Sequence, residues 1–372
     1  MKLFKKGGNM QVNITEGGKK NQLLYNAFMN ERILEELENV PDVITDGKDA
    51  FALLKSLINN EIELYKLKIS MQEWKRINYE LKKIKEFDIA KTVLFGRALT
   101  CIIPSTRDIP IAIWGVENCS YIHYRLGITN VNSWLYNLPF ERFFNHRRKL
   151  LTPYCVYVQK GQKVLLLKSI YAKFGKNNIL RGKDNENYYY VSSKPINPDL
   201  IKKKVVVANL NEEVYEENVS VLTYKELDKL GYYSFSIIEV ENIKYMSEEY
   251  FSEEQIYQRT REIFNCRIPE ISAFTEIAEI RILLEHTEYK LIYQEQLMEI
   301  LNKLCGIDMT TADHLRREIA KGKKESLSGL RQILIDQYGE NGQKLFDYLY
   351  KNGRYTISKA YVVANLQNLI EY

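Results

Sequence analysis

Apolar residues recur at helical spacing near the start of the chain and over its last third. They return every three or four positions in residues 21–39, 51–86 and 252–372, which predicts amphipathic helices. Single glycines and a proline interrupt the last stretch, so we expect several helices there. The first 20 residues hold four glycines among polar and basic side chains, and this composition cannot bury enough surface to become ordered.

Short β-branched runs replace the helical spacing between residues 90 and 240. Helical or turn segments separate these runs, a pattern that predicts a sheet with helices. The runs are 99–103, 110–113, 154–158, 204–208 and 232–240. The fold class is therefore α/β (α+β), followed by a mostly helical region. We predict an N-terminal tail and helix (1–40), a sheet-bearing domain (41–250) and a helical domain (251–372).

The composition is that of an ordinary globular protein. The 372 residues are 45% hydrophobic and 27% charged, which supplies enough apolar surface for one large or two moderate cores. The net charge of +5 permits binding to a polyanion without requiring it. No apolar run reaches the roughly 18 residues of a membrane helix, and no signal peptide follows the basic start. We expect a cytoplasmic protein without a membrane partner.

The cysteines and histidines show no spacing that suits a metal site. No two cysteines are as close together as a zinc knuckle or a redox motif requires. Each histidine lies on a segment without a second ligand at metal spacing, so we expect histidines without a metal. The residues concerned are Cys101, Cys119, Cys155, Cys266, Cys305, His123, His146, His286 and His314.

Four longer motifs follow one another in a fixed order. They are INYELKKIKE (77–86), LGITNVNSWLYNLPFERFFN (126–145), YKELDKLGYYSFSIIEV (224–240) and YQEQLMEILNKLCGIDMTTADHLRREIAKGKK (293–324), and YTISKAYVVA (355–364) comes after them. In this order they resemble the palm and fingers of the bacterial DNA polymerase III alpha subunit, the C-family replicative polymerase. The resemblance implies a nucleotidyltransferase-like palm with helical fingers. The family's thumb would be nearly absent, since only residues 162–187 remain for it.

The resemblance also shows where the family's catalytic aspartates should lie. That family uses three aspartates to hold two metal ions about 3.5 to 4 Å apart. Two belong on the strand after Pro153, yet no Asp or Glu occurs between Arg142 and Lys183, and the third position falls on Ser236. We expect Val156 and Val158 to pack where hydrated metal would sit. The prediction is no catalytic residue, no metal and no cofactor, with Mg²⁺ relevant only if the chain is an active polymerase.

The family's phosphate loop is also altered. Gly115 and Ser120 remain, but the loop arginine of the family is missing, and Trp114 and Glu117 stand among the retained residues. Glycines let backbone N–H groups approach a phosphate, whereas a carboxylate repels one. We therefore expect this loop to bind a triphosphate poorly.

Cationic residues remain where the family's fingers approach nucleotide and template. Retained Lys and Arg side chains are able to contact phosphate, and the alternative is a solvated helix face. The candidate nucleotide- or DNA-binding residues are Arg316, Arg317, Lys323, Lys324 and Lys359, with Lys321 beside them. The run Tyr293–Gln296 is better explained as a buried box that positions the fingers helix than as a chemical site.

Together these features predict a catalytically inactive homologue of the alpha subunit that serves as a nucleic-acid or replisome-protein binding module in DNA replication. Two alternatives stay open. One is an active DNA-directed DNA polymerase, or a polymerase fragment complemented by another chain. The other is a protein-binding mimic that competes with the alpha subunit. The candidate partners are DNA, replisome proteins and a full-length alpha subunit.

Overall fold

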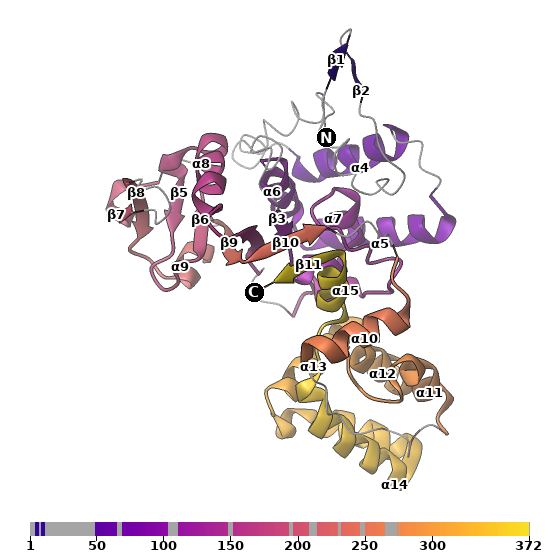
Figure 1. Cartoon of the computed structure of the whole chain (residues 1–372). Helices are drawn as coiled ribbons and strands as arrows, with labels where there is room; N and C mark the ends of the chain where they lie inside the picture. The colour runs from indigo at the N-terminus through magenta and orange to yellow at the C-terminus, as the bar shows by residue number, and fades with distance from the viewer. Residues whose placement is uncertain are drawn as a thin grey trace.

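A computed structural model shows a sheet-bearing part joined to a helical part (Figure 1). It describes residues 4–6, 9–11, 49–64, 69–102, 111–147, 152–192, 196–207, 214–229, 232–245, 250–264, 274 and 276–371. The helix predicted in residues 21–39 lies outside these ranges. Within residues 1–40 the structure describes a short antiparallel hairpin, β1 (Phe4–Lys6) and β2 (Asn9–Gln11).

A mixed sheet forms the centre of the sheet-bearing part. In the described residues it has seven strands in the order β3-β4-β9-β6-β5-β8-β7. The strands are β3 (Ile111–Ile113), β4 (Tyr154–Gln159), β5 (Ile179–Arg181), β6 (Tyr188–Val191), β7 (Ile201–Val207), β8 (Val214–Ser220) and β9 (Tyr233–Val240). The pair β4 and β9 is parallel, while β3 and β6 run antiparallel to their neighbours in this centre. The expected mixed α/β fold is confirmed.

Helices from the first half of the chain pack with this sheet in one core. They are α4 (Ala50–Leu64), α5 (Met71–Glu86), α6 (Ala90–Cys101), α7 (Tyr121–Arg125) and α8 (Lys163–Phe174). The periodicity of residues 51–86 belongs to two helices, because Ser70 begins α5 with a capping box to Glu73. The strand predicted at 99–103 is wrong. Its first residues end α6, whose residues from Val93 to Thr100 are all buried, so the helix lacks an amphipathic signal.

The helical part is inserted between two elements of the sheet-bearing part. It contains α10 (Glu253–Phe264), α11 (Ala278–Leu284), α12 (Gln294–Cys305), α13 (Met309–Ala320) and α14 (Ser328–Asn352), and most of its apolar residues form a second core. After it, α15 (Lys359–Gln367) packs into the first core, and β11 (Asn368–Glu371) pairs with β10 (Asn242–Tyr245). The predicted boundary at residue 251 stays a prediction, but the end of the chain packs with the sheet.

A small lobe at the far side of the sheet has its own core. Leu180, Tyr190, Ile196 and Leu227 fill it, and α9 (Tyr224–Lys229) covers it. The edge strand β7 carries Lys202, Lys203 and Lys204, which are all exposed. Lysines on an edge strand discourage pairing with other chains, so their position has a structural explanation without a ligand. No helix among the described residues is long and apolar enough to cross a membrane.

A buried carboxylate on α5 holds the start of α7 in place. Glu80 accepts hydrogen bonds from Arg76 Nε at 2.5 Å, Ser120 Oγ at 2.8 Å, and the backbone N–H groups of Tyr121 and Ile122 at 2.9 Å. These amides belong to the first turn of α7, where a helix has no internal acceptor for them. Glu80 is fully buried, so it satisfies donors that water cannot reach.

Replacing Glu80 with Ala should lower the free energy of unfolding by about 3 to 5 kcal/mol, because Arg76 loses its buried partner and the α7 amides lose their acceptor. Urea denaturation followed by circular dichroism measures this loss. Glu86→Ala is the matched control on the same helix, since Glu86 pairs with Lys83 at the surface. An equally small effect of both changes would contradict the structural role of Glu80.

Candidate site at the palm strands and the fingers junction

The register of β4 and β9 decides which of their side chains share a face. Cys155 pairs with Ser236, and Val156 pairs with Ile237. Paired residues of neighbouring strands point to the same side of a sheet, and successive residues point to opposite sides. Cys155, Tyr157 and Ser236 therefore belong to one face of the sheet, whereas Val156 and Val158 belong to the other.

The face of Val156 and Val158 is the hydrophobic core. Both valines are buried in it together with Phe235 and Ile237. We expected these valines to fill the place of metal beside Ser236, and this expectation is wrong. On β4 the residues that share a face with Ser236 are Cys155 and Tyr157, because Cys155 pairs with Ser236 and the valines alternate with these residues along the strand.

The face of Ser236 carries neutral side chains. Burial raises the pKa of the half-buried Cys155 thiol, although the nearby Ser236 hydroxyl acts in the opposite direction. The ring of Tyr157 lies 4.9 Å from that of Trp114, which in turn lies 5.5 Å from the ring of Tyr361 on α15. This face therefore joins a thiol, a hydroxyl and aromatic rings that meet at tilted and edge-on angles.

The carboxylates near these strands do not gather on that face. Glu239 alternates with Ser236 on β9 and points to the other side, where it accepts a hydrogen bond from Gly161 N at 2.9 Å. Glu117 is buried, and its charge contributes to raising the pKa of Cys155. Across the described residues no group of three His, Cys, Asp or Glu side chains is able to hold a metal ion. The donor set does not fit the family's pair of metal ions.

The altered phosphate loop folds back on the protein. Residues Val116–Cys119 form a 3₁₀ turn, and Glu117 lies inside the fold rather than toward solvent. The hydroxyl of Ser120 donates to Glu80 and accepts from His123 N. Glu80 also accepts hydrogen bonds from the backbone N–H groups of Tyr121 and Ile122. Because these N–H groups already have an acceptor, they are not available to bind a phosphate.

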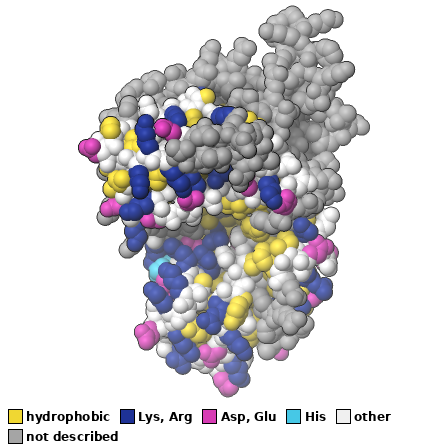
Figure 2. Space-filling model, turned by 60° about the vertical axis from the view of Figure 1, so that its left-hand side comes forward, with side chains coloured by type: hydrophobic (Ala, Val, Ile, Leu, Met, Phe, Trp, Pro, Cys, Tyr) yellow, Lys and Arg dark blue, Asp and Glu magenta, His cyan; other side chains and the backbone are white. Residues whose placement is uncertain are grey.

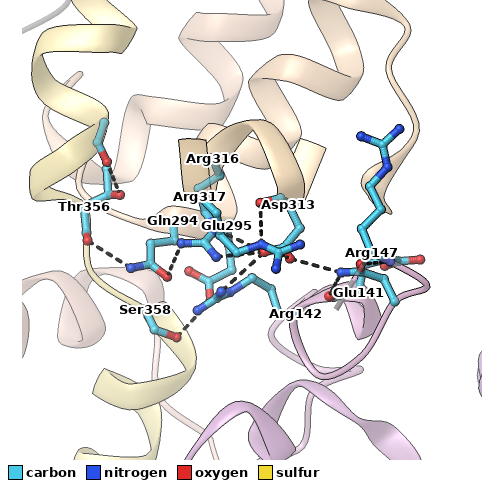
Figure 3. A network of polar contacts seen from close by, with 12 residues as sticks. Glu141, Arg142, Arg147, Gln294, Glu295, Asp313, Arg316, Arg317, Thr356 and Ser358 are labelled. Atoms are coloured by element: carbon cyan, nitrogen blue, oxygen red, sulfur yellow. Dashed lines mark hydrogen bonds and ion pairs between the residues drawn. The ribbon is translucent and has the colours of Figure 1, made fainter. Parts of the chain in front are cut away.

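Asp313 lies at the centre of an arginine cluster between the two parts (Figure 3). Its carboxylate is 2.9 Å from Arg316 Nη2, 3.2 Å from Arg317 Nε and 3.5 Å from Arg142 Nη1. Asn145 Nδ2 also donates to it at 3.0 Å. Arg142 and Asn145 come from the FERFFN motif of the sheet-bearing part, so Asp313 fastens α13 to that motif.

Glu295 makes a second junction beside Asp313. Its carboxylate accepts hydrogen bonds from Ser358 Oγ at 3.0 Å and Lys359 N at 2.9 Å, and it lies 3.8 Å from Arg142 Nε. Gln294 Nε2 donates to Thr356 O at 3.1 Å. The YQEQ run thus connects α12 to the start of α15 and to the FERF motif, and the structure shows it as a positioning box.

Burial and the neighbouring Arg142 lower the pKa of Arg316 to about 10, so Arg316 is still cationic at neutral pH. Burial acts to lower the pKa of Arg142 as well, but Glu295 and Asp313 outweigh it and the pKa is raised. The carboxylates of this cluster therefore keep both guanidinium groups charged in a place that excludes water.

The predicted binding residues fall into two groups. Arg316 is buried against Asp313, and Lys359 is mostly buried with its Nζ 2.5 Å from Glu253 Oε1. Lys323 and Lys324 each expose 59% of their side chains, and Arg317 exposes 26%. The structure does not bring the five residues into one cluster, and their contact with nucleotide or DNA stays a prediction.

Sequence reasoning named His314 only as a histidine without a metal and Arg147 only as part of a basic run with a solvated turn as the favoured interpretation, and it placed neither residue beside Arg317. His314 lies one turn before it on α13, and Arg147 approaches from the sheet-bearing part, where its charge affects His314. The helical spacing of His314, Arg317 and Lys321 was a usable signal. Arg147 gave no such signal, because it is far away in the sequence.

Comparison with known proteins finds two domain matches. A family model described as the bacterial DNA polymerase III alpha NTPase domain matches residues 52–188. Another, described as the bacterial DNA polymerase III alpha subunit finger domain, matches residues 249–342. The first match includes β4 and the altered loop, and the second includes α12 and α13.

Similar curated proteins carry the name DNA polymerase III subunit alpha. The protein of Thermotoga maritima is 24% identical over 322 residues, covering 66% of this chain and 38% of that protein. The protein of Bacillus subtilis is 30% identical over 92 residues, covering 23% of this chain and 8% of the relative. That of Buchnera aphidicola is 35% identical over 91 residues, with the same shares. The chain spans well under half the length of these relatives.

Replacing Val156 with Asp should destabilise the protein by roughly 3 kcal/mol or more, because a charge would enter the core without a partner. Cys155→Asp places the same charge on the half-buried opposite face, where a loss of about 1 kcal/mol is expected. Urea denaturation of both variants compares the two faces. A larger loss for Cys155→Asp would show that the register of β4 and β9 is wrong.

Asp313→Asn keeps the shape of the side chain but removes the charge that the arginines share. We expect a loss of about 3 kcal/mol in unfolding free energy and faster hydrogen exchange in α13, because Arg142 and Arg316 would then repel each other. The control is Asp336→Asn on the exposed face of α14, which should change stability by less than about 0.5 kcal/mol. Unchanged exchange in α13 would argue against the junction.

Proposed function

Because the chain is related to the bacterial DNA polymerase III alpha subunit through its NTPase and finger domains, we propose that it is a catalytically inactive relative that binds nucleic acid in DNA replication. The observation that carries the proposal is the pairing of Cys155 with Ser236 on the palm strands. Joining nucleotides needs clustered carboxylates for two metal ions, and this face offers a thiol and a hydroxyl instead. The proposed setting is the cytoplasm.

Binding of nucleic acid without catalysis is consistent with the Lys and Arg side chains that remain exposed near α13. Figure 2 shows Lys and Arg side chains gathered around a hollow between the upper, sheet-bearing part and the lower, helical part. Lys321, Lys323 and Lys324 follow the second arginine of α13, and each exposes 59% of its side chain. Their amino groups lie between 3.4 and 3.9 Å from carboxylates of Glu318 and Asp347, and because the lysine side chains are largely in water they can exchange these contacts for phosphate.

Two other functions remain as competitors. An active polymerase would need carboxylates from another chain at the face of Cys155 and Ser236. A mimic of the alpha subunit would bind a protein partner through its surface and would not need the exposed lysines. Primer extension separates the first from our proposal, and the salt dependence of DNA binding separates the second.

The pure protein should not extend a primer. We expect no incorporation of labelled deoxynucleotides onto a primed template in Mg²⁺ or in Mn²⁺, because the described side chains offer no cluster of three metal-ligating groups. A purified alpha subunit serves as the positive control on the same template. Metal-dependent extension by this chain, persisting after a second column step, would overturn the inactive assignment.

The protein should bind a labelled oligonucleotide, with an affinity that falls steeply as salt rises. The double change Lys323→Glu and Lys324→Glu should weaken binding and reduce the slope of log affinity against log salt by about 1.5 to 2, because two phosphate contacts are lost. Fluorescence anisotropy at several salt concentrations measures both effects.

The matched control reverses two exposed charges on the edge strand β7, Lys202→Glu and Lys203→Glu. It makes the same change in net charge away from the stretch that follows α13, so it should leave the salt slope almost unchanged. Equal losses for the two double variants would mean that only overall charge matters. Absence of binding by the unaltered protein would refute nucleic-acid recognition.

A further inference from the structure

Three basic side chains form a stripe along α13 and its C-cap. His314, Arg317 and Lys321 are three and four residues apart, so they follow one another along one face of the helix. Arg317 uses its Nε to contact Asp313, whereas its Nη2 is buried and has no hydrogen-bond partner among the described residues. The stripe therefore holds a guanidinium group with an unused donor.

Arg147 adds a fourth basic side chain from the other side of the junction. It follows the FERFFN motif, and Figure 3 shows its side chain extending away from the Asp313 network. Burial is the main reason that the pKa of His314 is lowered, and the charges of Arg147, Arg317 and Lys321 lower it further. Arg147 N donates a hydrogen bond to Asn145 Oδ1 at 3.0 Å, and Asn145 Nδ2 donates to Asp313, the residue before His314 on α13. These contacts bring Arg147 to the stripe, so the four groups gather at one place.

The acidic groups around the stripe are already engaged. Glu318, which acts to raise the pKa of His314, is paired with Lys321 at 3.4 Å and with Lys323 at 3.6 Å. Asp313 is shared among the arginines of the junction. Asp308 caps α13 through the amides of Thr310 and Thr311. The groups that face His314 thus leave an excess of positive charge.

We propose that Arg147, His314, Arg317 and Lys321 form a binding site for the phosphate groups of a nucleic-acid strand, and that His314 takes up a proton when phosphate binds. This inference rests on the proposed function and specifies the contacts and the proton that accompany binding. Arg147 and Arg317 are suited to phosphate because a planar guanidinium can donate two hydrogen bonds to it. Lys321 adds a charge at the end of the stripe.

The direction of the pH effect follows from the charges. In the free protein the surrounding cations disfavour the protonated imidazole, so His314 is neutral at pH 8. A phosphate offsets these cations and raises the pKa of His314 in the complex. Binding therefore takes up a proton from solvent, and affinity rises as the pH falls toward 6. Each unit by which the pKa rises on binding gives up to about a tenfold gain in affinity.

The test measures the binding of a fluorescent single-stranded oligonucleotide at pH 6.0 and pH 8.0 and at constant ionic strength. We expect the full chain to bind several-fold more tightly at the lower pH, as its unliganded His314 titrates below the ordinary pKa of about 6.5. His314→Gln should lose the gain at pH 6.0, so that the ratio of its affinities at pH 6.0 and pH 8.0 falls to about one. His146→Gln, which changes the exposed histidine next to Arg147, should retain the gain.

Arg147→Gln provides a second, independent readout. It should weaken binding at both pH values, and it should raise the pKa of His314 in the free protein, as followed by the imidazole signals in NMR. Inorganic triphosphate is the competitor that separates a strand from a free phosphate compound. Displacement of the oligonucleotide by equimolar triphosphate would overturn the assignment to a strand.

Each failure points to a different claim. If the oligonucleotide binds but the pH gain persists in His314→Gln, the stripe is refuted while nucleic-acid binding stands. If Arg147→Gln changes neither affinity nor the titration of His314, the four groups do not form one site. If no oligonucleotide binds at either pH, the proposed function fails together with this inference.

Discussion

The structure depends on a buried junction in which Asp313 and Glu295 hold arginines from separate segments. Charges withdrawn from water are costly unless each finds a partner, so the guanidinium groups and carboxylates require one another. Since Arg142 belongs to the sheet-bearing part and Asp313 to α13, these contacts also fix how the helical insertion meets the sheet. The same carboxylate also holds Arg316 and Arg317 of α13.

The neutral face of β4 and β9 changes stability as well as chemistry. Clustered carboxylates repel one another unless a cation neutralises them, and a thiol beside a hydroxyl has no such requirement. Cys155 and Ser236 therefore let the two strands pair without a metal ion. On the opposite side, Val156 and Val158 stabilise the sheet by ordinary burial, which is worth roughly 1.5 to 3 kcal/mol for each valine.

The ion-pair partner of an Arg or Lys side chain, rather than its position in a motif, decides whether that side chain is structural or suited to binding a ligand. Arg316 and Lys323 come from one motif, but Arg316 is enclosed with Asp313 while Lys323 extends into water. Arg316 gives the buried Asp313 two hydrogen bonds, at 3.1 Å from Nε and 2.9 Å from Nη2, and both would be lost if it turned to phosphate, whereas Arg317 contacts this carboxylate through Nε alone. Binding is therefore assigned to side chains whose ion pairs are exposed or incomplete, such as those of Lys324 and Arg317.

The sequence by itself determined the mixed α/β fold, the strands around Pro153 and Ser236, the helical character of most of residues 252–372 and the lack of acidic residues after Arg142, because spacing and composition are local properties of the chain. It did not determine which face of β4 Ser236 shares, nor that Arg142 would reach Asp313, 171 residues away. A shift of one residue in pairing reverses a strand's faces, and an ion pair exists only where folding brings distant charges together. Register and charge pairing were therefore decided by the tertiary structure.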